Sequence, residues 1–108
     1  MRIHELKTWP EPFSEVVRGD KTVEIRSSRD RSFRAGDLLL LRHFDNIRDS
    51  YEDRHGDTPE ALVLVTHVVQ GGSWGIPADL DVLSIRLLHY DGGIGLQAGL
   101  WLELPSPA

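Results

Sequence analysis

The chain has 108 residues, of which 40% are hydrophobic and 27% charged, and its net charge is −5. This length and balance predict one globular domain with a modest core and exclude a disordered chain. The absence of cysteine excludes disulfides, zinc–thiolate sites and thiol catalysis. There is no apolar run near the ~20 residues of a membrane span and no apolar segment of a signal peptide at the start, so a cytoplasmic protein without membrane contact is expected.

The first predicted elements are a short strand over residues 3–7 and a short helix after it. Thr8 and Glu11 have the spacing of a capping box, which predicts that the helix begins here. Three apolar residues then form one stripe at helical spacing: Phe13, Val16 and Val17. Gly19 suits the left-handed end of a helix. We therefore expect a helix of about two turns that packs on a larger sheet.

The rest of the chain predicts strands in succession. Residues 21–26 alternate, which predicts a strand with Val23 and Ile25 directed inward. The four leucines of 38–41 predict a strand buried on both faces, and residues 46–59 a charged, hairpin-like excursion. Residues 61–69 and 82–88 predict two further strands, with a glycine-rich turn between them.

One helix and about five strands without βα alternation disfavour a parallel α/β sheet. The predicted fold is mainly β (α+β), a small, partly open β-barrel of about five to six strands with one short N-terminal helix at an end.

Charge is unevenly distributed. Residues 18–34 hold six basic against three acidic residues, whereas from residue 55 onward Arg86 is the single base against six acids. This predicts one basic face on an acidic body, a pattern that suits a nucleic-acid contact better than the net charge does.

The strongest candidate site lies at the end of the predicted helix. Lys21 begins the following strand, and Thr22, Glu24 and Arg26 share the face opposite Val23 and Ile25. Arginine offers a forked donor for phosphate or a base edge, and glutamate accepts from an exocyclic amine. The alternative is a solvated strand face with an ion pair worth ~0–1 kcal/mol.

Three further arginines, Arg29, Arg31 and Arg34, follow in the next loop. They suit a nucleic-acid backbone, with Trp9, Phe33 or Trp74 available to stack on a base. The alternative is a solubilising loop with Asp30 as the local partner. The five histidines lack metal-ligand spacing, so neither a metal nor a cofactor is expected.

The segments HELKTWPEPF, RGDKTVEIRSSRDRSFRAGDLLLLRHFD and VLSIRLL resemble the ASCH superfamily of PUA-like domains, in particular its small bacterial and phage members of unassigned function. The hallmark of that superfamily, G-x-K-x-x-E-x-R, is matched by Gly19, Lys21, Glu24 and Arg26. Residues 33–37 match its F-x-x-G-D lead-in to a strand. The resemblance covers about residues 3–88, which predicts a domain over 1–90 and a Gly- and Pro-containing tail over 91–108.

The resemblance implies a PUA-like barrel with a cleft beside the motif strand, where relatives bind RNA or a modified nucleoside. Some relatives hydrolyse N4-acetylcytidine with a lysine matching Lys21, a threonine nucleophile and a distant glutamate. Here Glu24 takes the place of the threonine, Thr22 lies on the same side, and no glutamate lies between Glu60 and Glu103.

We therefore predict a module that binds single-stranded RNA or a modified nucleoside, with its oligomeric state left open. The predicted ligand-binding residues are Lys21, Thr22, Glu24, Arg26, Arg29, Arg31 and Arg34. The alternative is an amidohydrolase of the N4-acylated cytidine type, or a ribonuclease, with Lys21 and Glu24 as the catalytic pair. A third hypothesis is a protein-interaction domain whose arginine face meets an acidic partner.

Overall fold

The computed structural model describes residues 1–29, 31–52 and 57–92, which form six strands and one helix. In chain order the elements are β1 (Ile3–Thr8), α1 (Pro10–Arg18), β2 (Val23–Ser27), β3 (Leu38–Asp45), β4 (Ser50–Tyr51), β5 (Glu60–Val69) and β6 (Leu80–Asp91). The mainly β prediction with one short helix is confirmed. The predicted tail over 91–108 lies outside the described residues from residue 93 onward.

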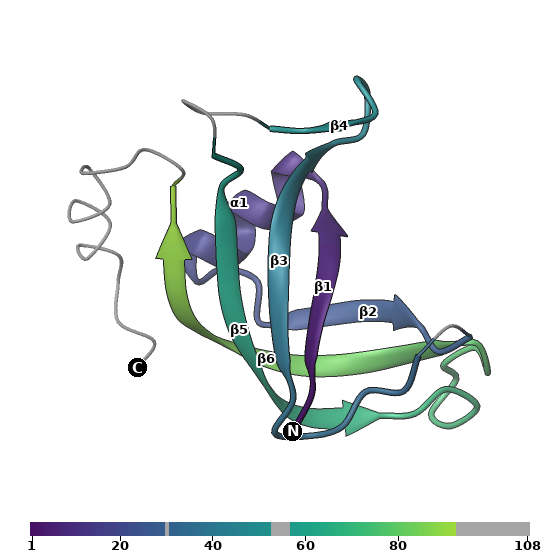
Figure 1. The fold of residues 1–108 in the computed structure, drawn as a ribbon. Helices are drawn as coiled ribbons and strands as arrows, with labels where there is room; N and C mark the ends of the chain where they lie inside the picture. Colours follow the sequence, from purple (N-terminus) through teal and green to yellow (C-terminus); the bar gives the residue numbers. More distant parts are fainter. Residues whose placement is uncertain (30, 53–56, 93–108) are drawn as a thin grey trace.

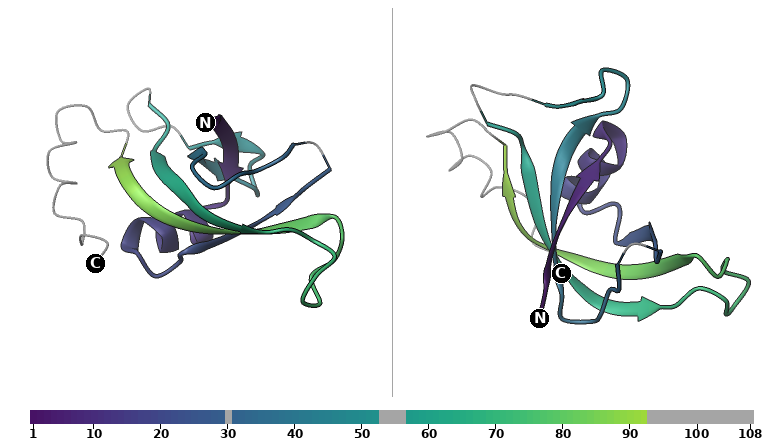
Figure 2. Two further views of the ribbon diagram at one scale, coloured as in Figure 1. Left: turned by 90° about the horizontal axis from the view of Figure 1, so that it is seen from below. Right: turned by 45° about the vertical axis from the view of Figure 1, so that its right-hand side comes forward.

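All six strands belong to one sheet, in the order β1-β3-β5-β6-β2, with β4 paired to β3. β1 runs parallel to β3, and the other pairs are antiparallel. The sheet curls into a half-barrel (Figures 1 and 2). Its two edge strands, β1 and β2, are not paired with each other. We call the open side between them the seam.

The core fills the inner face of this curl. Its most completely buried side chains come from the three central strands: Leu39, Leu41, Val63, Val65 and Leu83. The helix α1 adds Phe13 and Val16 and packs against β3, β5 and β6. Each such side chain stabilises the fold by about 1.5–3 kcal/mol through burial.

Two local predictions are wrong. Trp9, and not Thr8, caps α1, and it makes no side-chain capping bond, because Thr8 is the last residue of β1. A proline at the first helical position starts the helix instead. In β3, Leu39 and Leu41 are buried but Leu38 and Leu40 are only half-buried, because no helix or strand of the described residues covers the outer face of the sheet. The left-handed stop at Gly19 (φ 83°) is confirmed.

The faces of β2 are the reverse of the prediction. Glu24 is buried, whereas Val23 and Ile25 are exposed. The cause is the register with β6, where Glu24 lies opposite Leu83, a residue of the core. Opposite residues of paired strands share a face, so the polar side of β2 is turned into the curl.

A buried carboxylate joins the start of β1 to the turn before β3. Asp37 accepts hydrogen bonds from the backbone amides of Arg2 (3.0 Å) and Arg34 (3.0 Å) and from His4 Nε2 (2.9 Å). Burial by itself raises the pKa of Asp37, but these hydrogen bonds outweigh it and lower the pKa below its ordinary value. The parallel pair β1–β3 is thereby fastened at its end.

Candidate functional site

The turn after α1 places the G-x-K-x-x-E-x-R motif beside the seam. The amide of Gly19 donates to Val16, and the amides of Asp20 and Lys21 both donate to the carbonyl of Glu15. These bonds satisfy carbonyls that the helix end leaves free. They also set Lys21 immediately before β2, beside the side chains that project from that strand.

Three motif side chains form an ion-pair triad around a buried carboxylate. The carboxylate of Glu24 is only 3% exposed and lies between two cations. Lys21 Nζ contacts its Oε1 at 2.5 Å, and Arg26 Nε contacts its Oε2 at 2.9 Å. Both carboxylate oxygens are engaged, so Glu24 organises the two cations and is not free to accept from a ligand in this conformation.

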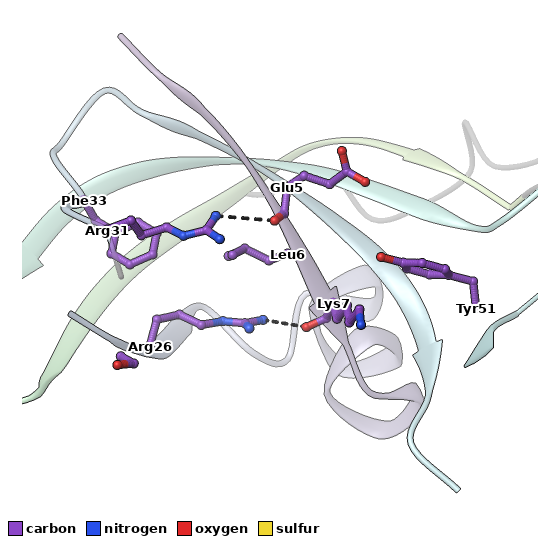
Figure 3. A pocket seen from close by; sticks show the side chains of 8 residues that line it. Glu5, Leu6, Lys7, Arg26, Arg31, Phe33 and Tyr51 are labelled. Atoms are coloured by element: carbon purple, nitrogen blue, oxygen red, sulfur yellow. Dashed lines mark hydrogen bonds between the residues drawn. The ribbon is translucent and has the colours of Figure 1, made fainter. Parts of the chain in front are cut away.

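Arg26 also bridges the seam. Its Nη2 donates to the carbonyl of Lys7 (3.2 Å) and to Thr8 Oγ1 (3.3 Å), both in β1. Arg31 Nη1 reaches the carbonyl of Glu5 in the same strand at 3.4 Å. Figure 3 shows both guanidinium groups directed at the backbone of β1. The arginines therefore satisfy carbonyls of an edge strand that no other strand of the described residues pairs on this side.

Hollows open on both sides of Arg26. The smaller, of about 210 Å³, lies beside Thr8, Trp9, Lys21 and Glu24. The larger, of about 380 Å³, is lined by residues from β1, β2, β4 and the loop after β2, namely Glu5, Leu6, Lys7, Arg26, Ser27, Arg31, Phe33 and Tyr51 (Figure 3). We call the two together the seam cleft. Its larger half has the volume of a small-molecule site.

Cations and aromatic rings line this cleft. Among the described residues, four cationic side chains but only two carboxylates line it. The cations are Lys7, Lys21, Arg26 and Arg31, and the carboxylates are Glu5 and Glu24. The ammonium of Lys7 lies 4.6 Å from the ring centre of Phe44, and no ion pair involves it in the described parts of the chain. Glu5 is paired with Arg42 at 3.0 Å. The cleft therefore carries a net positive charge and suits an anionic ligand.

Arg42 forms a charged support behind the larger hollow. It lies between the carboxylates of Glu5 (3.0 Å) and Glu60 (3.2 Å), and its guanidinium carbon is 4.4 Å from the ring centre of Tyr51. Burial by itself lowers its pKa, but the hydrogen bond to Glu5 and the field of Glu60 raise it above its ordinary value. This contact holds the Tyr51 ring at the wall of the cleft.

The structure brings four of the seven predicted ligand-binding residues to the seam: Lys21, Glu24, Arg26 and Arg31. Thr22 is exposed just before β2, and its carbonyl accepts from Ile85. Arg29 is exposed and paired with Asp79 at 3.2 Å. Arg34 lines other hollows. Arg29 and Arg34 are thus separated from the triad, because the chain turns away after β2 toward β3. Thr22 adjoins Lys21 in the chain but lines neither half of the seam cleft.

Sequence reasoning missed the contribution of β1 and β4. Lys7, Thr8 and Tyr51 border the cleft, yet none belongs to the G-x-K-x-x-E-x-R motif. A local signal existed for Lys7, since the alternation of residues 3–7 marks it as a side chain outside the core. That β1 would lie across the seam from β2 depends on a sheet order that no local pattern encodes.

No group of three histidine or carboxylate side chains within the described residues is arranged to hold a metal ion. In residues 1–29, 31–52 and 57–92, no helix has the length and apolarity that a membrane crossing requires.

Fold and site together define a small β half-barrel with a positively charged seam. Residues 3–85 match the family described as a domain of unknown function, DUF3850, so the chain belongs to this family. The matched residues include both edge strands and the Lys21–Glu24–Arg26 triad. No curated protein matches the chain.

Proposed function

We propose that the protein is an ASCH-like, PUA-like module that binds single-stranded RNA or a modified nucleoside in the seam cleft. The observation that carries this proposal is the position of Arg26 between two hollows. Its Nε and Nη2 are held by Glu24 and β1, whereas Nη1 donates to none of the described residues. A guanidinium fixed on one side, with donors left on the other, suits a phosphate or a base edge.

The surrounding side chains support the same ligand class. Lys7 and Arg31 supply positive charge in the larger hollow, and Tyr51 offers an aromatic wall. Trp9, which is 57% exposed, borders the smaller hollow. Stacking on aromatic rings combined with cations along the backbone is how proteins hold unpaired bases. In this proposal the protein binds its ligand in the cytoplasm and uses neither a membrane nor a cofactor.

The test is fluorescence anisotropy with labelled single-stranded RNA of about ten nucleotides, at low and moderate salt. We expect saturable binding that weakens with salt, because phosphate contacts release counterions. Arg26→Ala should weaken binding about tenfold, the size expected for a charge-assisted hydrogen bond. Because Arg26 also bridges the seam, Lys7→Gln provides a second variant, and it should weaken binding and reduce the salt slope by about one.

The matched control is Arg86→Ala, which removes the same charge from an exposed position on β6 that lines neither hollow. Its affinity should stay within twofold of the wild type. Competition by free nucleosides, including N4-acetylcytidine, tests the nucleoside form of the proposal. Absence of binding by both oligonucleotide and nucleosides would overturn it.

One observation favours a hydrolytic alternative, namely the contact between Lys21 and Glu24. A lysine and a carboxylate in contact can exchange a proton during amide or phosphodiester hydrolysis. The test is product formation from N4-acetylcytidine or from RNA. If the wild type forms product and both Lys21→Ala and Glu24→Ala abolish it, the protein is a hydrolase. Bound ligand recovered unchanged would leave it a binding module.

A further inference from the structure

A third hollow lies next to the seam cleft. It has a volume of about 570 Å³ and lies between residues 33–35 and the end of β5 with the loop that follows. Phe33 lines both this hollow and the larger half of the seam cleft, so the two hollows adjoin at this residue. We call it the loop hollow. A chain-like ligand leaving the seam cleft past Phe33 would meet it next.

The β5–β6 loop holds one tryptophan out in solvent. Trp74 is 91% exposed and has a φ of +53°, a left-handed conformation that bulky residues rarely adopt. Figure 1 shows this loop projecting from the end of the β5–β6 pair. A large apolar ring exposed to this extent contributes almost no burial to the fold. The unusual backbone conformation, in a bulky residue that is not buried, points to a role in binding.

Backbone hydrogen bonds and close packing hold the loop that carries Trp74. The amide of Gly71 donates to Asp81 Oδ1 (3.2 Å), and the amides of Gly72 and Ile76 bond within the loop at 2.8 and 2.9 Å. A Cβ at Gly71 would lie 2.3 Å from the carbonyl oxygen of Pro77, so the loop closes directly over this glycine. The ring of Trp74 is therefore presented on a rigid support, which lowers the entropic cost of stacking.

The charges around the loop hollow favour an anionic ligand. Arg34 is exposed, and no ion pair involves its guanidinium in the described parts of the chain. No carboxylate is among the described residues that line this hollow. An aromatic ring and a free guanidinium around one hollow are the elements of a stacked base with its phosphate.

We propose that the loop hollow is a second nucleotide subsite, in which Trp74 stacks on a base and Arg34 contacts the phosphate that leads to the seam cleft. This inference rests on the proposed function and makes it more specific. The ligand is then a single-stranded oligonucleotide that spans both sites, and a free nucleoside fills the seam cleft only.

The experiment compares a labelled dinucleotide with a labelled octanucleotide of RNA on wild type, Trp74→Ala and Arg34→Gln. The wild type should bind the octanucleotide at least tenfold more tightly. Each variant should lose about five- to tenfold in octanucleotide affinity and keep its dinucleotide affinity, because only the longer probe reaches Trp74. Trp74→Phe, which keeps an aromatic ring, should recover most of the loss.

The matched control is Ile47→Ala, which truncates another apolar side chain that is 91% exposed on a turn. It should not change either affinity. Octanucleotide binding that Arg26→Ala weakens but Trp74→Ala leaves unchanged would overturn the second subsite and leave the seam site standing. Absence of binding by both probes would overturn both proposals. Binding of an acidic peptide at Trp74 in place of RNA would assign the hollow to a protein partner.

Discussion

Glu24 sets the charge balance of the seam at the level of single residues. Its buried carboxylate separates Lys21 from Arg26, whose side chains are 29% and 24% exposed. Without the negative charge, two cations would face each other across a neutral, buried group. Breaking a buried pair from one side costs far more than losing an exposed one.

Replacing this carboxylate by its neutral isostere tests the triad. We expect Glu24→Gln to lower the free energy of unfolding by about 1–3 kcal/mol, since the partners are partly solvated and keep one acceptor. Urea denaturation at pH 7 measures the change. The control is Asp20→Asn, which breaks the exposed pair with Arg18 and should cost less than about 0.5 kcal/mol. Equal losses in the two variants would contradict a special role for Glu24.

At the scale of elements, the parallel pair β1–β3 needs a link between its strands that a hairpin turn supplies in an antiparallel pair. No hairpin can join parallel strands, so the chain passes through α1 and β2 between them. Asp37 compensates by binding the start of β1 through Arg2 and His4. The turn before β3 is thereby attached to β1 by side-chain chemistry.

These hydrogen bonds to the Asp37 carboxylate predict that stability depends on pH. The folded-state pKa of Asp37 lies below its ordinary value of 3.8, so the unfolded chain binds the proton more tightly. The stabilisation is complete above about pH 5 and is lost as the pH falls from there through the lower folded-state value. Urea midpoints of wild type and Asp37→Asn should therefore differ most near neutral pH and converge below pH 4. Parallel curves down to pH 2.5 would contradict the prediction.

At the scale of the whole molecule, the half-barrel leaves two edges facing each other. Arg26 and Arg31 cross the gap and bond to the carbonyls of Lys7 and Glu5. Their side chains replace the backbone ladder that would close a full barrel. The two edges are thus held together across the seam by the same groups that line the proposed binding cleft.

Removing one bridge should loosen the edges without unfolding the core. For Arg26→Ala we expect the amides of β2 to exchange with solvent about tenfold faster, because a charge-assisted bond to β1 and another to Glu24 are lost. The amides of Val63 and its neighbours in β5 should be unaffected, as should all amides in Arg86→Ala. Hydrogen exchange followed by mass spectrometry measures this. Uniform acceleration would show that Arg26 stabilises the whole fold and does not act locally.

Local patterns in the sequence were informative wherever neighbouring residues decide the outcome. The strand-forming residues of 61–69 and 82–88 predicted β5 and β6, and Gly19 predicted the end of α1. The spacing of Lys21, Glu24 and Arg26 predicted that they act together. Strand propensity, a left-handed stop and side-chain spacing all depend on a few consecutive residues.

The tertiary structure alone decided which way the site faces and what completes it. Alternation in residues 21–26 defines two faces of β2, but pairing with Leu83 of β6 selects the polar one as the inner face. Likewise, Thr8 resembles a helix cap in sequence, yet it accepts from Arg26, 18 residues away in the chain. The strands, the helix end and the motif follow from the sequence by itself. The seam, its two hollows and the bridge to β1 follow from strand order and curl, because contacts between distant segments form only when the sheet assembles.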